Sequence, residues 1–186
     1  MKKITIFLTT IMLLSTATLL AQDKFYTKKG KIYFNASAKM EKVEATNRAV
    51  IAIMDSKTGN IQFAVMLKGF EFEKALMQEH FNENYVESDK YPKAEFTGQV
   101  INNADIKYSK DGTYPAKVKG KLSIHGQSKD VEATGSMEVK NGIIKLNADF
   151  DILLSDFKID IPSLVSENIS NKTRISVECL MEPLKS

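Results

Sequence analysis

The feature of this sequence that most constrains its fold is an alternation of apolar and polar residues with a period of two. The alternation recurs in eight segments after residue 30. Successive side chains of a β-strand point to opposite faces of a sheet, so each segment predicts a strand with one apolar and one polar face. The expected strands cover residues 31–38, 43–54, 61–68, 93–101, 114–125, 129–139, 142–152 and 173–181.

Glycine-containing pairs between these segments indicate tight turns. The strongest signal is Asn141-Gly142, because both central positions of a type I′ hairpin turn need a positive φ angle. Other turns are indicated by Thr58-Gly59, Asp111-Gly112 and His125-Gly126.

Two stretches depart from the alternation. Residues 71–81 place apolar side chains at helical spacing among good helix formers and predict one short helix. Residues 162–170 are expected to hold a second helical turn, with Pro162 just before its start. No linker-like composition or internal repeat divides the chain, so one domain is expected.

Eight strands with one apolar face each must protect their edges, and closure into a barrel removes the edges altogether. The predicted fold class is therefore all-β, an eight-stranded antiparallel barrel with one or two short helices. A barrel of this size is either filled by side chains or holds one small ligand. The inward-facing positions mix Phe and Ile with Ala and Gly, which is compatible with both alternatives.

The first 21 residues predict a signal peptide. Lys2 and Lys3 precede an apolar run that extends to Leu20, and Ala21 supplies a small residue for cleavage. The alternative, a membrane anchor, requires about 20 uninterrupted apolar residues, whereas this run contains six Ser and Thr residues. We expect a mature domain of residues 22–186 that is exported, without stable membrane insertion.

Removing residues 1–21 from the 186-residue chain leaves 165 residues, which is enough for one sizeable core. The full chain has 26 basic and 23 acidic side chains, and loss of Lys2 and Lys3 reduces the net charge to +1. This balance does not favour a nucleic-acid partner. Cys179 is the single cysteine. It alternates with Val177 and Met181, which predicts a buried, inert thiol.

Residues suited to catalysis are few. His80, Glu83 and Glu87 have a spacing that could bind a metal on one helix face, but surface helices carry such sets routinely, so no metal is expected. His125 is expected at a solvent-facing turn position, where it could bond a backbone carbonyl. The aspartates at 149, 151, 156 and 160 could suggest acid/base chemistry, which needs two carboxylates in different environments within a cleft. Asp149 and Asp151 alternate with apolar residues and are interpreted as a solvated face. The sequence thus predicts no catalytic residue, no cofactor and no enzyme.

Several motifs resemble the YceI-like family. They are residues 76–81 (LMQEHF) with 88–96 (SDKYPKAEF), then 120–131 (GKLSIHGQSKDV), and finally 156–162 (DFKIDIP) with 175–177 (ISV). The resemblance covers residues 30–181. It implies a lipocalin-like periplasmic barrel whose interior holds a polyisoprenoid or another long-chain lipid. The family's usual opening pattern of Asp, His and Ser is not evident at residues 25–34, which bears on ligand identity more than on fold.

Two functions remain open at the level of sequence. One is binding, and also carriage or storage, of a long-chain lipid or isoprenoid. The other is a ligand-free structural or stress-related envelope protein with a filled barrel. The oligomeric state is also open, with a homodimer as one alternative. If a ligand is bound, the expected interior residues are Phe34, Phe63, Val65, Leu67, Phe72, Phe96, Leu122, Ile124 and Phe150.

Overall fold

The computed structural model describes residues 23–184. The predicted signal peptide and its cleavage point lie outside the described residues. A tight turn lies at the predicted hairpin, where Asn141 and Gly142 both have positive φ angles.

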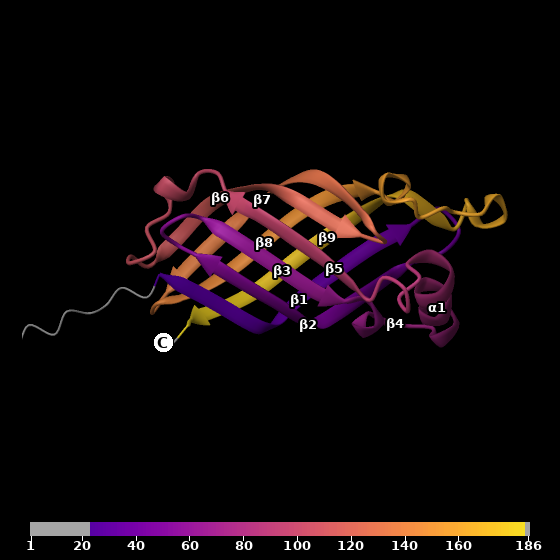
Figure 1. The fold of residues 1–186 in the computed structure, drawn as a ribbon, viewed down its shortest axis with the longest axis horizontal. Helices are drawn as coiled ribbons and strands as arrows, with labels where there is room; N and C mark the ends of the chain where they lie inside the picture. The colour runs from indigo at the N-terminus through magenta and orange to yellow at the C-terminus, as the bar shows by residue number, and fades with distance from the viewer. Residues whose placement is uncertain (1–22, 185–186) are drawn as a thin grey trace, which may run out of the picture.

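Eight antiparallel strands form one closed barrel (Figure 1), which confirms the predicted fold class. β1 pairs with both β2 and β9, and this double pairing closes the sheet. The barrel strands of the described chain therefore pair on both sides, which protects their backbone groups. The strands are β1 (Lys24–Ser37), β2 (Glu44–Asp55), β3 (Asn60–Met66), β5 (Lys93–Val100), β6 (Gly112–Ile124), β7 (Gln127–Lys140), β8 (Ile143–Leu153) and β9 (Ile169–Pro183).

The first strand is much longer than the sequence indicates, because it begins at Lys24 rather than at residue 31. Its pairing with β2 shifts register on both sides of Gly30. This β-bulge interrupts the alternation at the point where three lysines give the segment the composition of a loop. The strand is held by its two neighbours, so its extent depends on pairing that a single segment does not reveal.

The predicted helix at residues 71–81 is only partly correct. Glu71–Phe72 forms the short strand β4, which pairs with β2. The helix α1 then covers Ala75–His80 and continues as one π-helical turn over Phe81–Tyr85. The predicted turn after Pro162 is present as a 3₁₀ turn at Ser163–Val165. Three more 3₁₀ turns lie at Leu67–Gly69, Asn103–Asp105 and Leu154–Phe157.

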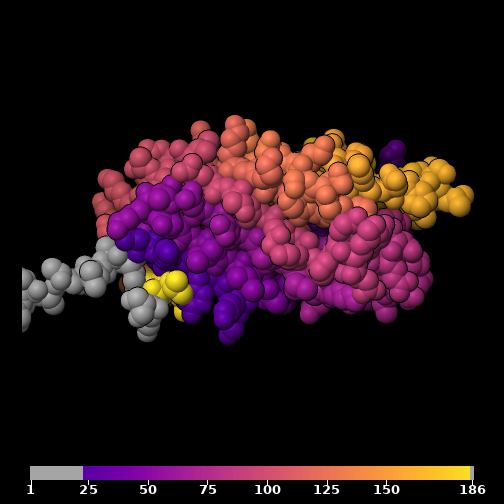
Figure 2. All heavy atoms as spheres, in the orientation of Figure 1, coloured from indigo at the N-terminus to yellow at the C-terminus, as the bar shows by residue number. Residues whose placement is uncertain are grey.

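The barrel has two different ends. At one end, here called the termini end, the first and last described strands meet, and the Leu184 amide donates a hydrogen bond to the Lys24 carbonyl. At the other, the helix end, lie α1 and the segment 154–168 that joins β8 to β9 (Figure 1). This segment projects beyond the strands, and Figure 2 shows it beside the helix at the same end of the molecule.

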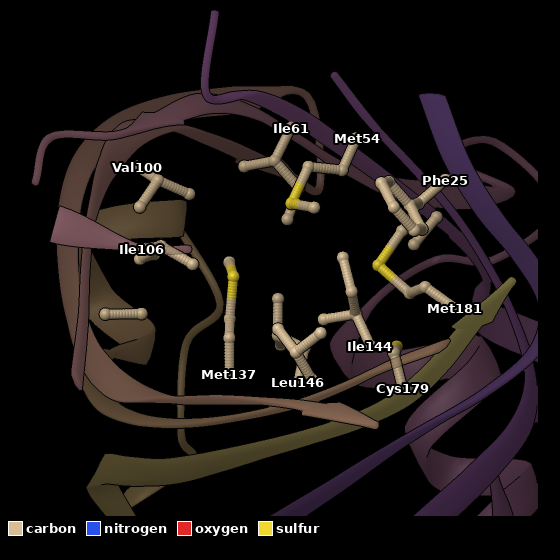
Figure 3. Close-up of a cluster of buried hydrophobic side chains, with 13 residues drawn as sticks. Phe25, Met54, Ile61, Val100, Ile106, Met137, Ile144, Leu146, Cys179 and Met181 are labelled. Carbon is tan, nitrogen blue, oxygen red and sulfur yellow. The ribbon is translucent and has the colours of Figure 1, made fainter. Parts of the chain in front are cut away.

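Inward-facing side chains fill the barrel at the termini end. Met54, Met137 and Met181 come from three different strands and are 0–1% exposed. Figure 3 shows them directed toward one another together with Phe25 and Ile144. Methionine adapts its shape to irregular gaps, so the three side chains close this end of the barrel. Together with Phe25 and Ile144 they are here called the packed layer.

Cys179 belongs to the same packed layer, as the alternation predicts, and burial raises the pKa of its thiol to about 12. A Cβ at Gly30 would lie 2.5 Å from the Cys179 sulfur, so the bulge of β1 covers the thiol closely. We expect Ellman's reagent to label Cys179 only after denaturation, because the thiolate is the nucleophile. Rapid labelling of the native protein would show that the barrel opens at this end.

The raised thiol pKa also predicts a loss of stability in alkali. The unfolded chain ionises this thiol near its ordinary pKa of 9.0, whereas the folded chain does so only near 12. Above pH 9 the unfolded state therefore releases its proton first, and the contribution to stability falls as the pH rises toward 12. Melting curves of the wild type and of Cys179→Ala, compared between pH 8 and 11, measure this difference.

Candidate functional site

The half of the barrel nearer the helix end encloses a cavity of about 280 Å³. Its wall consists almost entirely of apolar side chains from the strands, from α1 and from the segment 154–168. The structure places all nine residues proposed from the sequence on this wall, namely Phe34, Phe63, Val65, Leu67, Phe72, Phe96, Leu122, Ile124 and Phe150. Their role in ligand binding stays a prediction.

The exposure of the wall distinguishes it from the packed layer. Phe63, Phe150 and Ile175 point into the barrel, yet each is only half-buried. Ile144 and Met181 have the same inward phase on β8 and β9 and are fully buried at the termini end. Because a side chain in a packed interior has neighbours on all sides, these three half-buried side chains face space that protein atoms do not fill. The barrel is therefore packed in one half and hollow in the other.

Two glycines shape the deep part of the wall. Gly98 on β5 and Gly120 on β6 are direct partners across the sheet and face inward. A Cβ on either glycine would lie 2.4–2.6 Å from the Cζ atom of Phe96. The Phe96 ring therefore lies against the bare backbone of both strands. Any larger residue at these positions would push the ring toward the centre of the cavity.

Four phenylalanines attach the helical segment to the barrel. Phe34, Phe70, Phe72 and Phe81 form a cluster with ring centroids 5.1–5.7 Å apart. Packing of this kind between aromatic rings favours tilted and edge contacts. All four rings also line the cavity. Phe70 and Phe81 were missed in the sequence because they lie in a turn and at a helix end, where no period-two pattern marks the inward side.

A few polar side chains border the cavity at the helix end. Glu41 accepts a hydrogen bond from Lys74 at 3.0 Å, which ties the β1–β2 loop to the start of α1. His80 and Asn168 lie on the same border. His80 is exposed, as the sequence analysis expected, but it is close enough to the cavity to contribute to its lining. Deeper in, burial raises the pKa of the Tyr85 phenol.

His125 occupies a turn between β6 and β7 and its Nδ1 lies 3.1 Å from the Phe157 carbonyl oxygen. This contact confirms the structural role expected for the residue. The expectation that the ring faces solvent is wrong, since it is 12% exposed, stands edge-on to Tyr91 and lies 3.4 Å from the Glu87 carboxylate. The turn folds over the segment that follows the helix, so strand phase does not determine the direction of this side chain.

The carboxylates considered in the sequence do not form a site. Glu87 lies beyond the helix and interacts with Lys90 and His125, which together lower its carboxyl pKa. Asp151 is exposed and bonded to Lys172 and Arg174. Within residues 23–184 no group of three or more His, Cys, Asp or Glu side chains is placed to hold a metal. Over the same residues, none of the helices has the length and hydropathy needed to cross a membrane.

Comparison with protein families identifies the domain. The model of the YceI-like domain matches residues 21–180. The chain belongs to the YceI-like family. Membership confirms the resemblance carried by the sequence motifs, including the segment 120–131 that forms the β6–β7 hairpin. No curated protein is similar enough in sequence to match this YceI-like chain.

Two solved structures show the same fold at low identity. One is a polyisoprenoid-binding domain from Saccharophagus degradans implicated in plant cell wall breakdown, with a TM-score of 0.73 and 13% identity over 88% of this chain and 99% of that one. The other is BcnA of Burkholderia cenocepacia, with a TM-score of 0.67 and 15% identity over 82% of this chain and 96% of that one. These likenesses support the YceI-like barrel architecture.

Proposed function

We propose that this protein binds an apolar lipid chain inside the helix-end half of its barrel. The observation that carries the proposal is the unfilled cavity with an apolar wall of strand and helix residues. Pockets for small ligands are typically concave and apolar, with a few polar groups that orient the ligand. The polyisoprenoid bound by the related domain from Saccharophagus degradans is a ligand of this chemical type.

Burial of the apolar lipid chain inside the barrel supplies the binding energy. Each methylene group moved from water to an apolar site contributes about 0.8 kcal/mol, which corresponds to about a fourfold gain in affinity. Glu41, His80 and Asn168 border the cavity at the helix end and lie where the polar head of such a lipid would be. The deep positions of the wall include the apolar side chains of Ile61 and Leu146, which do not attract a second polar head group.

Two groups that could serve in catalysis, His125 and Cys179, lie outside the cavity wall. His125 is engaged with a backbone carbonyl and Tyr91, and the Cys179 thiol is buried in the packed half with a raised pKa. A nucleophile or a general base must be able to reach a reacting atom in the bound molecule. The proposal therefore assigns a carrier or storage role, in which the ligand leaves the barrel unchanged.

We also propose that the chain is exported and acts in the periplasm. The charged start, apolar run and Ala21 boundary of the first 21 residues support this location. We expect N-terminal sequencing of the protein from the native cell to begin at Gln22. Recovery of an intact Met1 end from the membrane fraction would contradict the proposal and identify the segment as an anchor.

Organic-solvent extraction of the purified protein, followed by mass spectrometry, tests the binding function. We expect one apolar lipid species to be enriched relative to an extract from an equal amount of an unrelated exported protein. Delipidated protein should take the lipid back at one molecule per chain. Failure to recover or to rebind any lipid would favour the alternative, a ligand-free structural or stress-related envelope protein.

A further inference from the structure

We infer that the mouth of the cavity docks onto the surface of a zwitterionic lipid bilayer and inserts three aliphatic side chains into it. These side chains, here called the rim residues, are 71%, 61% and 96% exposed and belong to Met40, Leu76 and Leu164, respectively. The inference goes beyond the proposed lipid-binding function and rests on it for the choice of partner.

The rim residues border the open end of the cavity. The packed layer closes the termini end, so the apolar wall reaches the surface at the helix end. Leu76 lies one helical turn before His80, which borders the cavity, so the two side chains share a face of α1. Each rim residue directly precedes a cavity-lining residue in the sequence, namely Glu41, Met77 and Val165. The exposed apolar side chains therefore continue the apolar wall outward.

Hydrogen bonds hold the three elements that carry the rim residues next to one another. The Ala38 and Met40 amides donate to backbone carbonyls of the segment 154–168 at 3.2 and 3.3 Å, which joins the β1–β2 loop to this segment. The Lys74 side chain donates to Glu41 at 3.0 Å, which joins the same loop to the start of α1. Three elements from distant parts of the chain thus present their apolar side chains at one end of the barrel.

Leu164 is the most exposed of the rim residues. It lies in the 3₁₀ turn Ser163–Val165. This turn belongs to the segment 154–168, which projects beyond the strands at the helix end (Figure 1, Figure 2). Single exposed apolar side chains are common on protein surfaces, whereas a group of them around a cavity marks an interaction site. A projecting tip is also the part of the barrel that meets a flat surface first.

The charge around the mouth favours a neutral lipid surface as the partner. Residues 38–43, 73–85 and 154–168 together contain four lysines, seven acidic side chains and no arginine. Attraction to anionic lipids needs a cluster of basic side chains, and an acidic excess opposes it. Protein interfaces are typically anchored by Arg, Tyr and Trp, whereas the exposed apolar side chains here are one methionine and two leucines. Aliphatic side chains enter the interface of a zwitterionic bilayer without a charged partner.

Docking at the mouth gives an apolar ligand a path that avoids water. A lipid chain that leaves the bilayer passes between the rim residues and reaches the apolar wall of the cavity directly. Insertion of a few aliphatic side chains is weak and reversible, since even one myristoyl chain gives only marginal membrane binding. The barrel can therefore leave the bilayer after it has taken up or released its ligand.

Flotation of the delipidated protein with phosphatidylcholine vesicles tests the inference. We expect part of the protein to float with the vesicles, in low and in high salt alike, because apolar insertion is not screened by ions. Leu164→Ser should lower the partition coefficient about tenfold. Leu180→Ser is the matched control, because Leu180 is 54% exposed on the outer face of β9 and precedes Met181 of the packed layer at the termini end. The control should bind as the wild type does.

A tryptophan at the projecting turn reports insertion directly, because the chain contains no tryptophan of its own. We expect the emission of Leu164→Trp to shift to shorter wavelength on vesicles and to be quenched by brominated phosphatidylcholine, and that of Leu180→Trp to stay unchanged. Equal quenching of the two reporters, or binding that is lost in high salt, would overturn the inference. Absence of vesicle binding would also overturn it and leave the rim residues to a protein partner. Lipid extraction and rebinding use no vesicles, so failure of the proposed lipid-binding function is distinguished from failure of docking.

Discussion

Replacing Val65 by tryptophan is expected to remove most of the bound lipid while the barrel stays folded. Val65 lies on β3, faces the cavity and pairs with Ala94 on β5. The substitution replaces a small branched side chain by an indole ring, which extends from β3 into the cavity. Because the indole ring lies on the path of the lipid chain, the tryptophan takes the place of the ligand rather than of other protein atoms.

Lipid extraction and thermal melting on the same preparation measure the two effects. Met66→Trp is the matched control, since Met66 is the next residue on β3 and is 57% exposed on the outer surface. We expect the control to retain the wild-type lipid content. Unfolding of Val65→Trp with no lipid in the wild type would show that the barrel is solidly packed, because overpacking of a filled core typically costs about 1–3 kcal/mol. Unchanged lipid and stability would mean that residue 65 faces outward.

Truncation of Ile144 to alanine is expected to lower the free energy of unfolding by about 2–5 kcal/mol, the usual cost of an Ile→Ala change in a packed core. Ile144 is fully buried at the termini end among Met181 and Leu146. Its removal leaves an unfilled space that neighbouring strands cannot close. For a chain of this length each kcal/mol lowers the melting temperature by about 2–4 °C.

Ile175→Ala provides the matched comparison. Ile175 is also an inward-facing isoleucine, but on β9 it lines the cavity and is half-buried. The side chain already faces empty space on one side, so its removal loses fewer contacts and creates little new cavity. In delipidated protein we expect Ile175→Ala to lower the free energy of unfolding by less than half as much as Ile144→Ala does. Denaturant unfolding measures both changes. Equal costs would contradict the division of the barrel into a packed half and a hollow half.

The feature best predicted from the sequence was which strand side chains point into the barrel. The alternation placed Phe63, Val65 and Phe150 on the inner face, where the structure has them. The alternation gave wrong or incomplete strand bounds where a bulge or a helix-like spacing of apolar residues conceals it. The bulge at Gly30 concealed the first part of β1, and the helical spacing of residues 71–81 extended over Glu71–Phe72, which pairs with β2 instead. In both places pairing with a distant strand overrides the local signal.

The candidate site could be predicted only as a set of inward positions. Phe70 and Phe81 reach the cavity from a turn and from the end of a helix, where no periodic pattern indicates direction. His125 is buried against Tyr91 although it follows the outward phase of β6. Such directions depend on how the loops at the helix end fold over one another, and this is a long-range property of the chain.

Eight strands with one apolar face each could be predicted from the sequence alone, because that pattern depends only on the twofold period of extended backbone. Whether the enclosed space is filled was decided by tertiary structure. Met54, Met137 and Met181 meet from three strands and fill one half, whereas Phe96 lies against Gly98 and Gly120 and leaves the other half hollow. Empty volume is the remainder after side chains from opposite walls have packed, so it depends on which residues face one another across the barrel and not on the composition of any single strand.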